Sequence, residues 1–193
     1  MRQVLAIAGS LRRGSLNRFL LRAAAGLAPA GMTIAVEEDL ASIPLFDEDL
    51  ETATAGGPEP VSRLRAKVAS ADGLLIATPE YNHSIPGVLK NAIDWLSREA
   101  GDEVLAGKPV AVVGASGGPW GTRLSQAALR QVLYATESPV LPRPALFLRD
   151  ARRLFDESGR LTDASTRDRL AAVLAAFARW MDVLARADAS TRP

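Results

Sequence analysis

Residues 4–17, VLAIAGSLRRGSLN, decide the fold. Their first part, residues 4–8, is continuously apolar, which is typical of a strand buried on both faces of a parallel sheet. A glycine and a serine end this strand. Apolar residues then recur at helical spacing over 16–27, with Ser15 as the expected N-cap. A buried strand that turns directly into an amphipathic helix is the repeating unit of a doubly wound α/β fold.

The same alternation continues along the chain. Further strands are predicted at 33–37, 74–77, 110–113 and 145–148, and further helices at 61–71, 86–96, 123–134 and 170–184. The first, third and fourth strands are uniformly apolar, whereas the second alternates and the fifth follows Pro142 and Pro144, which are signs of edge strands. We therefore expect a five-stranded parallel sheet in the order 2-1-3-4-5, with helices on both faces and ligands at its carboxyl edge.

Two segments fall outside this alternation. Residues 39–60 are predicted to form a long loop, and the acidic run at 47–49 within it is expected to be solvated rather than to bind a metal. Residues 189–193 are expected to fray. The length of 193 residues suits one domain spanning 1–193.

The composition excludes several kinds of chemistry. The chain has no cysteine and one histidine, which rules out thiolate catalysis and both Cys-ligated and multi-histidine metal sites. The formal net charge of +1 disfavours a nucleic-acid partner. Because no apolar stretch is long enough for a membrane span or a secretory signal, we expect a cytoplasmic protein with no membrane partner. Catalysis is left to polar side chains, backbone groups or a borrowed cofactor.

The loop at residues 9–17 is predicted to bind phosphate. It leads into a helix N-terminus, whose free N–H groups and partial positive charge attract anions, and it adds hydroxyls, an amide and two arginines. An ordinary N-cap beside solvated arginines is the alternative. Ser15 stands where a Walker A loop has lysine, and Leu11 where the dinucleotide-binding fingerprint has its second glycine, so both of those motifs are disfavoured.

The loop after the third strand, TPEYNHSIPG at 78–87, has its path fixed by two prolines and a glycine. It offers backbone amides and the Tyr81 ring to a planar ligand. Its histidine, His83, is expected to shape the site rather than catalyse, because no neighbouring nucleophile calls for a base. Trp95, on the following helix, is interpreted as a core or interface aromatic. As an exposed residue it would mark, with the loop near Phe46, a subunit interface.

The loop after the fourth strand, GASGGPWGT at 114–122, contains glycines that allow a ligand to approach the backbone closely. Its G-x-S-x-G spacing also matches the nucleophile elbow of α/β-hydrolases. In that fold, however, the histidine follows the serine along the chain, whereas His83 precedes Ser116. The hydrolase interpretation is therefore rejected.

The first loop, together with the motif PEYNHSIPGVLKNAIDW at 79–95, resembles the NADPH-dependent FMN reductases, which include quinone, chromate and azo-dye reductases. The likeness spans about residues 3–148. It implies a flavodoxin-like fold and FMN bound non-covalently at the carboxyl edge of the sheet. It also implies assembly as a homodimer or homotetramer through the helix that follows the second loop.

The resemblance further implies which residues bind FMN. They are Ser10, Arg12, Ser15, Leu16 and Asn17 for the phosphate, Pro79, Glu80, Tyr81 and Asn82 along the isoalloxazine, and Ser116, Gly117 and Gly118 in the third loop. Pro119 and Trp120 do not match a pattern of the family, so a substrate contact from Trp120 is left open.

The implied reaction is that of an NAD(P)H oxidoreductase. NADPH or NADH delivers hydride to flavin N5 and leaves, and a quinone, azo, chromate or free-flavin acceptor then takes the electrons in a ping-pong sequence. Such chemistry requires no catalytic side chain and no metal. A flavodoxin-type electron carrier that does not use nicotinamide is the alternative, and the near-neutral charge disfavours it because flavodoxins are strongly acidic. A phosphate-binding hydrolase is a third, weaker possibility.

Overall fold

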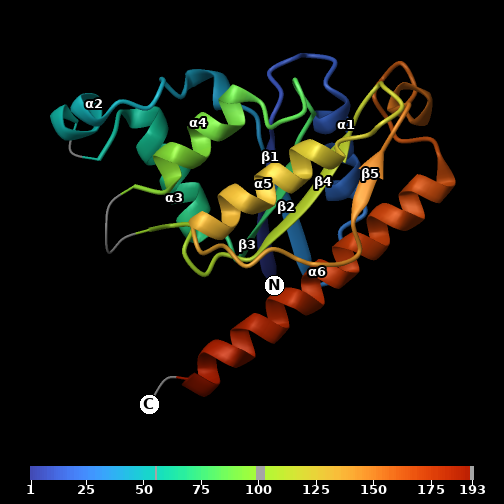
Figure 1. The fold of residues 1–193 in the computed structure, drawn as a ribbon. Helices are drawn as coiled ribbons and strands as arrows, with labels where there is room; N and C mark the ends of the chain where they lie inside the picture. Colours follow the sequence, from blue (N-terminus) through green and yellow to red (C-terminus); the bar gives the residue numbers. More distant parts are fainter. Residues whose placement is uncertain (55, 99–102, 192–193) are drawn as a thin grey trace.

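The computed structural model describes residues 1–54, 56–98 and 103–191. A five-stranded parallel sheet in the order β2-β1-β3-β4-β5 forms its centre (Figure 1), which confirms the predicted strand order. The strands are β1 Arg2–Ala8, β2 Met32–Glu37, β3 Gly73–Ala77, β4 Val110–Ala115 and β5 Leu146–Leu148. The predicted bounds agree with these to within two residues.

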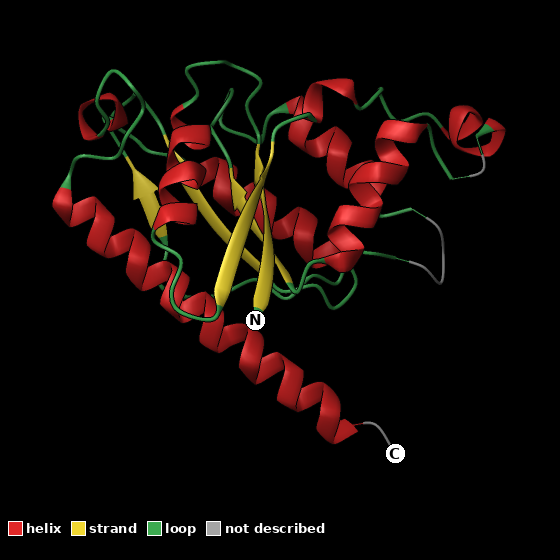
Figure 2. Ribbon diagram, turned by 180° about the vertical axis from the view of Figure 1, so that it is seen from behind, coloured by secondary structure: helices red, strands yellow, loops and turns green. Residues whose placement is uncertain are grey.

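Helices cover both faces of the sheet (Figure 2). They are α1 Leu16–Gly26, α2 Glu48–Ala53, α3 Glu59–Ser70, α4 Gly87–Leu96, α5 Arg123–Ala135 and α6 Ala164–Thr191, with the short 3₁₀ helices η1 Leu40–Ser42 and η2 Ala151–Leu154. Because strand side chains alternate in direction, Val4 and Ala6 join the core beneath α1 and α6, whereas Leu5 and Ile7 join the core beneath α3, α4 and α5. No helix in these described ranges is long and apolar enough to cross a membrane.

The segment predicted as one irregular loop, 39–60, contains more structure than expected. It holds η1, all of α2 and the start of α3. Asp47 accepts hydrogen bonds from the backbone N–H groups of Asp49 (2.8 Å) and Leu50 (3.4 Å), so the acidic run caps and begins α2. The periodicity of apolar residues could not predict α2, because none of its residues is buried. At the other end of the chain, α6 continues to Thr191, so the fraying expected from 189 is not seen in the described part.

Trp95 lies in the core, which confirms one of its two expected roles, whereas the exposure expected for the interface role was wrong. Its side chain is 1% exposed, and its indole Nε1 donates to the carbonyl of Pro44 at 2.9 Å. The Phe46 ring packs edge-on against it, with 4.9 Å between ring centroids. Trp95 therefore fastens the segment before α2 to α4 and is not available to a second subunit.

Candidate functional site

Three loops meet at the carboxyl edge of the sheet because β1, β3 and β4 are neighbours. The first loop (9–15) follows β1, the second (78–86) follows β3, and the third (116–122) follows β4. Gly9 N donates to Ala77 O at 2.9 Å, which ties the first loop to the end of β3. A Cβ on Gly9 would lie 3.0 Å from Leu89 Cδ2, so the first loop passes α4 closely and glycine is favoured there.

The first loop presents unpaired donors at the start of α1. Ser15 is the N-cap, as predicted, and its Oγ accepts from Arg18 N at 3.3 Å. Among the residues described, the backbone amides of Leu16 and Asn17 have no acceptor, and Ser10, a buried residue, makes no hydrogen bond through its hydroxyl. Arg12 is exposed beside them. Free amides, a serine hydroxyl and a guanidinium together suit a phosphate group.

Asn17 has a structural role that the sequence did not reveal. Its Nδ2 donates to Ala115 O and its Oδ1 accepts from Ala115 N, both at 2.9 Å, and the side chain is buried. The amide thus joins the first turn of α1 to the end of β4, which places the first and third loops relative to each other. Leu16 packs half-buried against the core, so the phosphate-loop function expected of these two residues rests on their backbone N–H groups.

The second loop folds into a tight hairpin turn over residues 81–84. Tyr81 and Ser84 exchange two backbone hydrogen bonds of 3.0 Å, and both central residues are left-handed, with φ of 49° at Asn82 and 63° at His83. Positive φ at both central positions is the pattern of a type I′ turn, and Asn and His tolerate that conformation better than most residues. The hairpin rests on buried Pro79 and leaves the Tyr81 ring 47% exposed at the edge of the sheet.

Glu80, which is distant in the sequence, caps the N-terminus of α5 with its carboxylate. Thr122, the N-cap residue, makes no side-chain capping bond, and Glu80 Oε2 instead accepts from Leu124 N (2.9 Å) and Ser125 N (3.0 Å). His83 Nδ1 lies 3.8 Å from the other carboxylate oxygen, Oε1, and the His83 side chain is 82% exposed. The Glu80 carboxylate is therefore engaged by α5, and this loop is held against the third.

Buried hydroxyl groups strengthen the same junction. The Oγ1 of Thr78 and the Oγ of Ser125 lie 2.7 Å apart, and each donates to Pro79 O at 2.8 Å in alternative arrangements. Gly114 has no space for a side chain here, because an added Cβ would overlap Thr122 Oγ1 and lie 2.6 Å from Thr78 O. Sequence reasoning singled out none of these residues as a support, since the partners are far apart along the chain.

The third loop is held by its own hydrogen bonds and by the segment after β5. Ser116 Oγ accepts from Gly118 N at 3.1 Å, and Ser116 N donates to Leu148 O at 2.9 Å. Asp150 N in turn donates to Gly118 O at 3.0 Å. Gly117 is exposed at the crest of the loop, and the Arg152 side chain lies beside it, since an added Cβ would be 3.0 Å from Arg152 Nε. The structure thus gathers all twelve predicted binding residues into the three loops and the first turn of α1 at one edge of the sheet.

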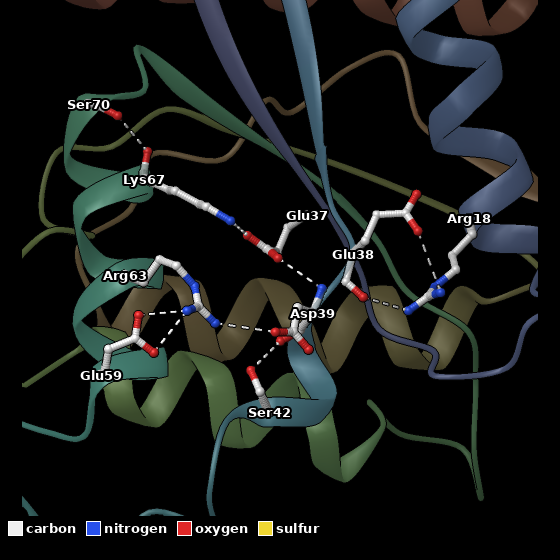
Figure 3. Close-up of polar contacts among 9 residues, drawn as sticks. All are labelled: Arg18, Glu37, Glu38, Asp39, Ser42, Glu59, Arg63, Lys67 and Ser70. Atoms are coloured by element: carbon white, nitrogen blue, oxygen red, sulfur yellow. Dashed lines mark hydrogen bonds and ion pairs between the residues drawn. The ribbon is translucent and has the colours of Figure 1, made fainter.

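The carboxyl end of β2, in contrast, is closed by ion pairs (Figure 3). Buried Glu37 accepts from Lys67 Nζ at 2.7 Å and from Asp39 N at 2.9 Å. Arg63 bridges Asp39 and Glu59. These charged groups are thus paired with one another, in contrast to the open donors at the start of α1.

The loops together suit a planar ligand that carries a phosphate, as FMN does. The first loop supplies donors for the phosphate, the hairpin supplies an exposed aromatic ring and backbone, and the third loop supplies a glycine crest. The backbone amides of Leu16 and Asn17 and the hydroxyl of Ser10 have no partner among the described residues, and these free donors fit the phosphate of such a group.

Comparisons with known proteins agree with this geometry. The family model described as NADPH-dependent FMN reductase matches residues 2–152. The chain is 44% identical to an NAD(P)H-dependent FMN reductase of Pseudomonas aeruginosa, over 93% of this chain and 95% of that protein. It is 37% identical to a 2-hydroxy-1,4-benzoquinone reductase of a Burkholderia species, over 93% and 96% of the two chains. The solved flavoenzyme NAD(P)H:(acceptor) oxidoreductase of Paracoccus denitrificans superimposes with a TM-score of 0.85 at 34% identity, covering 94% of this chain and 98% of that one.

Proposed function

Because the chain belongs to the NADPH-dependent FMN reductase family, we propose that it is an FMN-dependent oxidoreductase that takes hydride from NADPH or NADH. The two electrons pass to a small oxidised acceptor of the quinone, azo, chromate or free-flavin class. One substrate leaves before the other binds, in a ping-pong sequence. The names of the relatives, an FMN reductase and a benzoquinone reductase among them, support this choice of acceptors.

The observation that carries the proposal is the set of free donors at the start of α1. The backbone amides of Leu16 and Asn17 donate no hydrogen bond to another described group. They lie beside the buried residue Ser10 and exposed Arg12. A helix N-terminus left open in this way stabilises an anion, and with its phosphate held there FMN would have the neighbouring hairpin and the third loop within reach of its ring.

Each loop has a separate task in binding and orienting. Ser10, Arg12 and Ser15 would hold the phosphate, residues 79–82 would lie along the isoalloxazine, and residues 116–118 would contact another part of the ring. When bound, FMN supplies the two-electron chemistry that accepts hydride and passes electrons on. The protein contributes a fixed geometry, because Asn17 and Glu80 lock the three loops together.

No side chain of the site is required to act as a nucleophile or base. His83 is the one histidine, and its exposed position at the tip of the hairpin suits a residue that shapes the entrance rather than one that transfers a proton. The acceptor and nicotinamide would reach the same exposed side of the cradle, beside Tyr81, which is consistent with alternate rather than simultaneous occupation.

The visible spectrum of the purified protein, followed by anaerobic addition of NADPH or NADH, tests the proposal. We expect a yellow protein, or one that takes up FMN, whose absorbance near 450 nm bleaches with either nucleotide and returns when a quinone is added. A protein that takes up no FMN contradicts the proposal. A bound flavin that neither nucleotide bleaches would favour a flavodoxin-type carrier.

We also propose assembly as a homodimer or homotetramer. Burial of Trp95 removes one expected contact, but Leu45, next to Phe46, remains 81% exposed and apolar. Sedimentation or light scattering distinguishes these assemblies from a monomer. A monomer at all concentrations would contradict this part of the proposal.

A further inference from the structure

A cavity of about 730 Å³ lies beside the third loop and outside the three-loop cradle. It is lined by the third loop, the first residue of α5, the end of β5, the last residue of η2 and the first turns of α6. None of the interactions described above fills it. Its size falls within the usual range for small-molecule sites.

Three arginines line this cavity. Arg123, Arg149 and Arg169 line it, and none of them forms an ion pair within 4.0 Å in the part of the chain that the structure describes. Unpaired guanidiniums that converge on one cavity are suited to bind an anion with several oxygens.

One carboxylate, Asp163, faces the same cavity and is already engaged. Its Oδ1 accepts from Thr166 N at 2.7 Å in the first turn of α6, and hydrogen bonds from Thr166, with a smaller contribution from Arg169, lower the pKa of this carboxyl. Three guanidinium charges against one carboxylate leave the cavity lining positive.

The cavity shares a wall with the cradle. The hydrogen bond from Asp150 N to Gly118 O sets Arg149 beside the crest of the third loop. Trp120 follows Gly118 by two residues, so their Cα atoms are at most about 8 Å apart. A ligand of dinucleotide length can therefore lie in the cavity with one end and over the cradle with the other.

Two aromatic groups complete the cavity. The Arg123 guanidinium carbon lies 5.6 Å from the centroid of the Phe147 ring, a cation–π contact that restricts its orientation before any ligand binds. The indole of Trp120 is 81% exposed at the mouth, where a flat base could stack on it.

We propose that this cavity binds the adenosine phosphate end of the nicotinamide nucleotide, with Arg149 and Arg169 on its phosphate groups and Trp120 against the adenine. The assignment rests on the proposed function, which requires NADPH or NADH to place its nicotinamide over the cradle. It gives a role to Trp120, which the loop pattern alone did not assign. It also separates the residues that hold the nucleotide from those that hold FMN.

Calorimetric binding to the flavin-loaded protein is the first test, with two probes that carry no hydride. Adenosine 2′,5′-bisphosphate reports on a 2′-phosphate contact, and ADP reports on a pyrophosphate contact. The variants are Arg149→Ala, Arg169→Ala and the double variant, all at exposed positions. The matched control is Arg179→Ala, which is also exposed on α6 but does not line the cavity.

We expect each single variant to bind at least one probe about tenfold more weakly, as for loss of a charge-assisted hydrogen bond, and the control to remain within about twofold. Weakening for adenosine 2′,5′-bisphosphate alone identifies the 2′-phosphate as the group bound, and weakening for both probes identifies the pyrophosphate. The FMN content should be unchanged, and the KM for the same nucleotide should rise while kcat is kept. A lysine at position 169, in Arg169→Lys, should restore part of the affinity.

The result that overturns the assignment is a double variant with unchanged affinity for both probes and unchanged KM for NADPH and NADH. An increase confined to the KM of the quinone acceptor would overturn it as well, because the cavity would then be an acceptor site. In both cases reduction of the wild-type flavin by NAD(P)H would show that the proposed function still stands. Failure of both nucleotides to reduce the wild-type flavin would instead contradict the proposed function itself.

Discussion

The N-termini of α1 and α5 lie at the same edge of the sheet and differ in how their free amides are satisfied. At α1 a neutral hydroxyl, Ser15, caps one amide and leaves others open. At α5 the carboxylate of Glu80 accepts from two amides and brings a full negative charge. The partial positive charge of α1 is therefore available to an anionic ligand, whereas that of α5 is neutralised by the protein.

This difference shows that a helix N-terminus can serve as a ligand site when the protein supplies no carboxylate to accept hydrogen bonds from its free amides. The Glu80 carboxylate converts α5 into a fixed support, which the hydroxyls of Thr78 and Ser125 reinforce. The open α1 is in turn held in place by Asn17, whose two bonds to Ala115 leave its own backbone N–H free. Substitutions at these residues can separate the binding role from the supporting role.

Asn17→Ala should have the largest effect, because it removes the link between α1 and β4. Two buried hydrogen bonds are lost and the N–H and C=O of Ala115 remain unsatisfied, so the free energy of unfolding should fall by about 2–4 kcal/mol. Urea unfolding measures this loss. The exposed Gln131→Ala serves as control and should change it by less than about 0.5 kcal/mol. A similarly small change in Asn17→Ala would show that the link is not needed.

Arg12→Ala should act on binding and spare the fold. The exposed guanidinium would make a charge-assisted hydrogen bond to the FMN phosphate, and its loss should weaken FMN binding by about 1.5–3 kcal/mol, or about ten- to a hundredfold. Fluorescence titration of the apoprotein with FMN measures the change. Arg22→Ala, on α1 and paired with Glu38, should leave the FMN dissociation constant unchanged. An unchanged constant in Arg12→Ala would place the phosphate elsewhere.

Glu80→Gln should have a smaller effect, mainly on stability. The amide oxygen can still accept a hydrogen bond from α5, but the charge at its N-terminus is lost, which should lower the free energy of unfolding by about 0.5–1 kcal/mol. Ser15→Ala, at the cap of α1, should lower it by about 1 kcal/mol and also weaken FMN binding. If Glu80→Gln weakens FMN binding as much as Ser15→Ala, the distinction between the open and the closed helix fails.

His83→Ala should have the smallest effect. The side chain is exposed at the tip of the hairpin, so we expect the rate of flavin reduction to stay within about one order of magnitude of wild type. Anaerobic stopped-flow mixing with NADPH measures it. A collapse of this rate with FMN still bound would make His83 a catalytic residue. Because His83 has a φ of 63°, His83→Asn is the better-tolerated comparison at this backbone position.

Periodicity predicted the strand order through the buried or edge character of each strand, and loop position predicted the cap at Ser15, because these signals lie in residues close together in the sequence. The roles of Asn17 and Glu80 could not be predicted, since their partners lie 98 and 44–45 residues away. An apolar side chain carries no sign of whether a second layer covers it, and for that reason the sequence could not decide between a core and an interface role for Trp95. Its cover is the segment from Pro44 to Phe46, which the sequence indicated only as loop.

The course of α6 determines which end of the chain can be linked to a solid support without covering the three loops. The helix starts near the carboxyl edge, runs along the sheet and ends at Thr191 on the far side, where β1 also begins, while the three loops lie opposite (Figure 1). A linker fused after α6, or before β1, would therefore hold the molecule with its cradle facing away from a bead or an electrode. Immobilisation through either end should preserve access for nucleotide and acceptor, whereas coupling through the arginines of the first loop should block it.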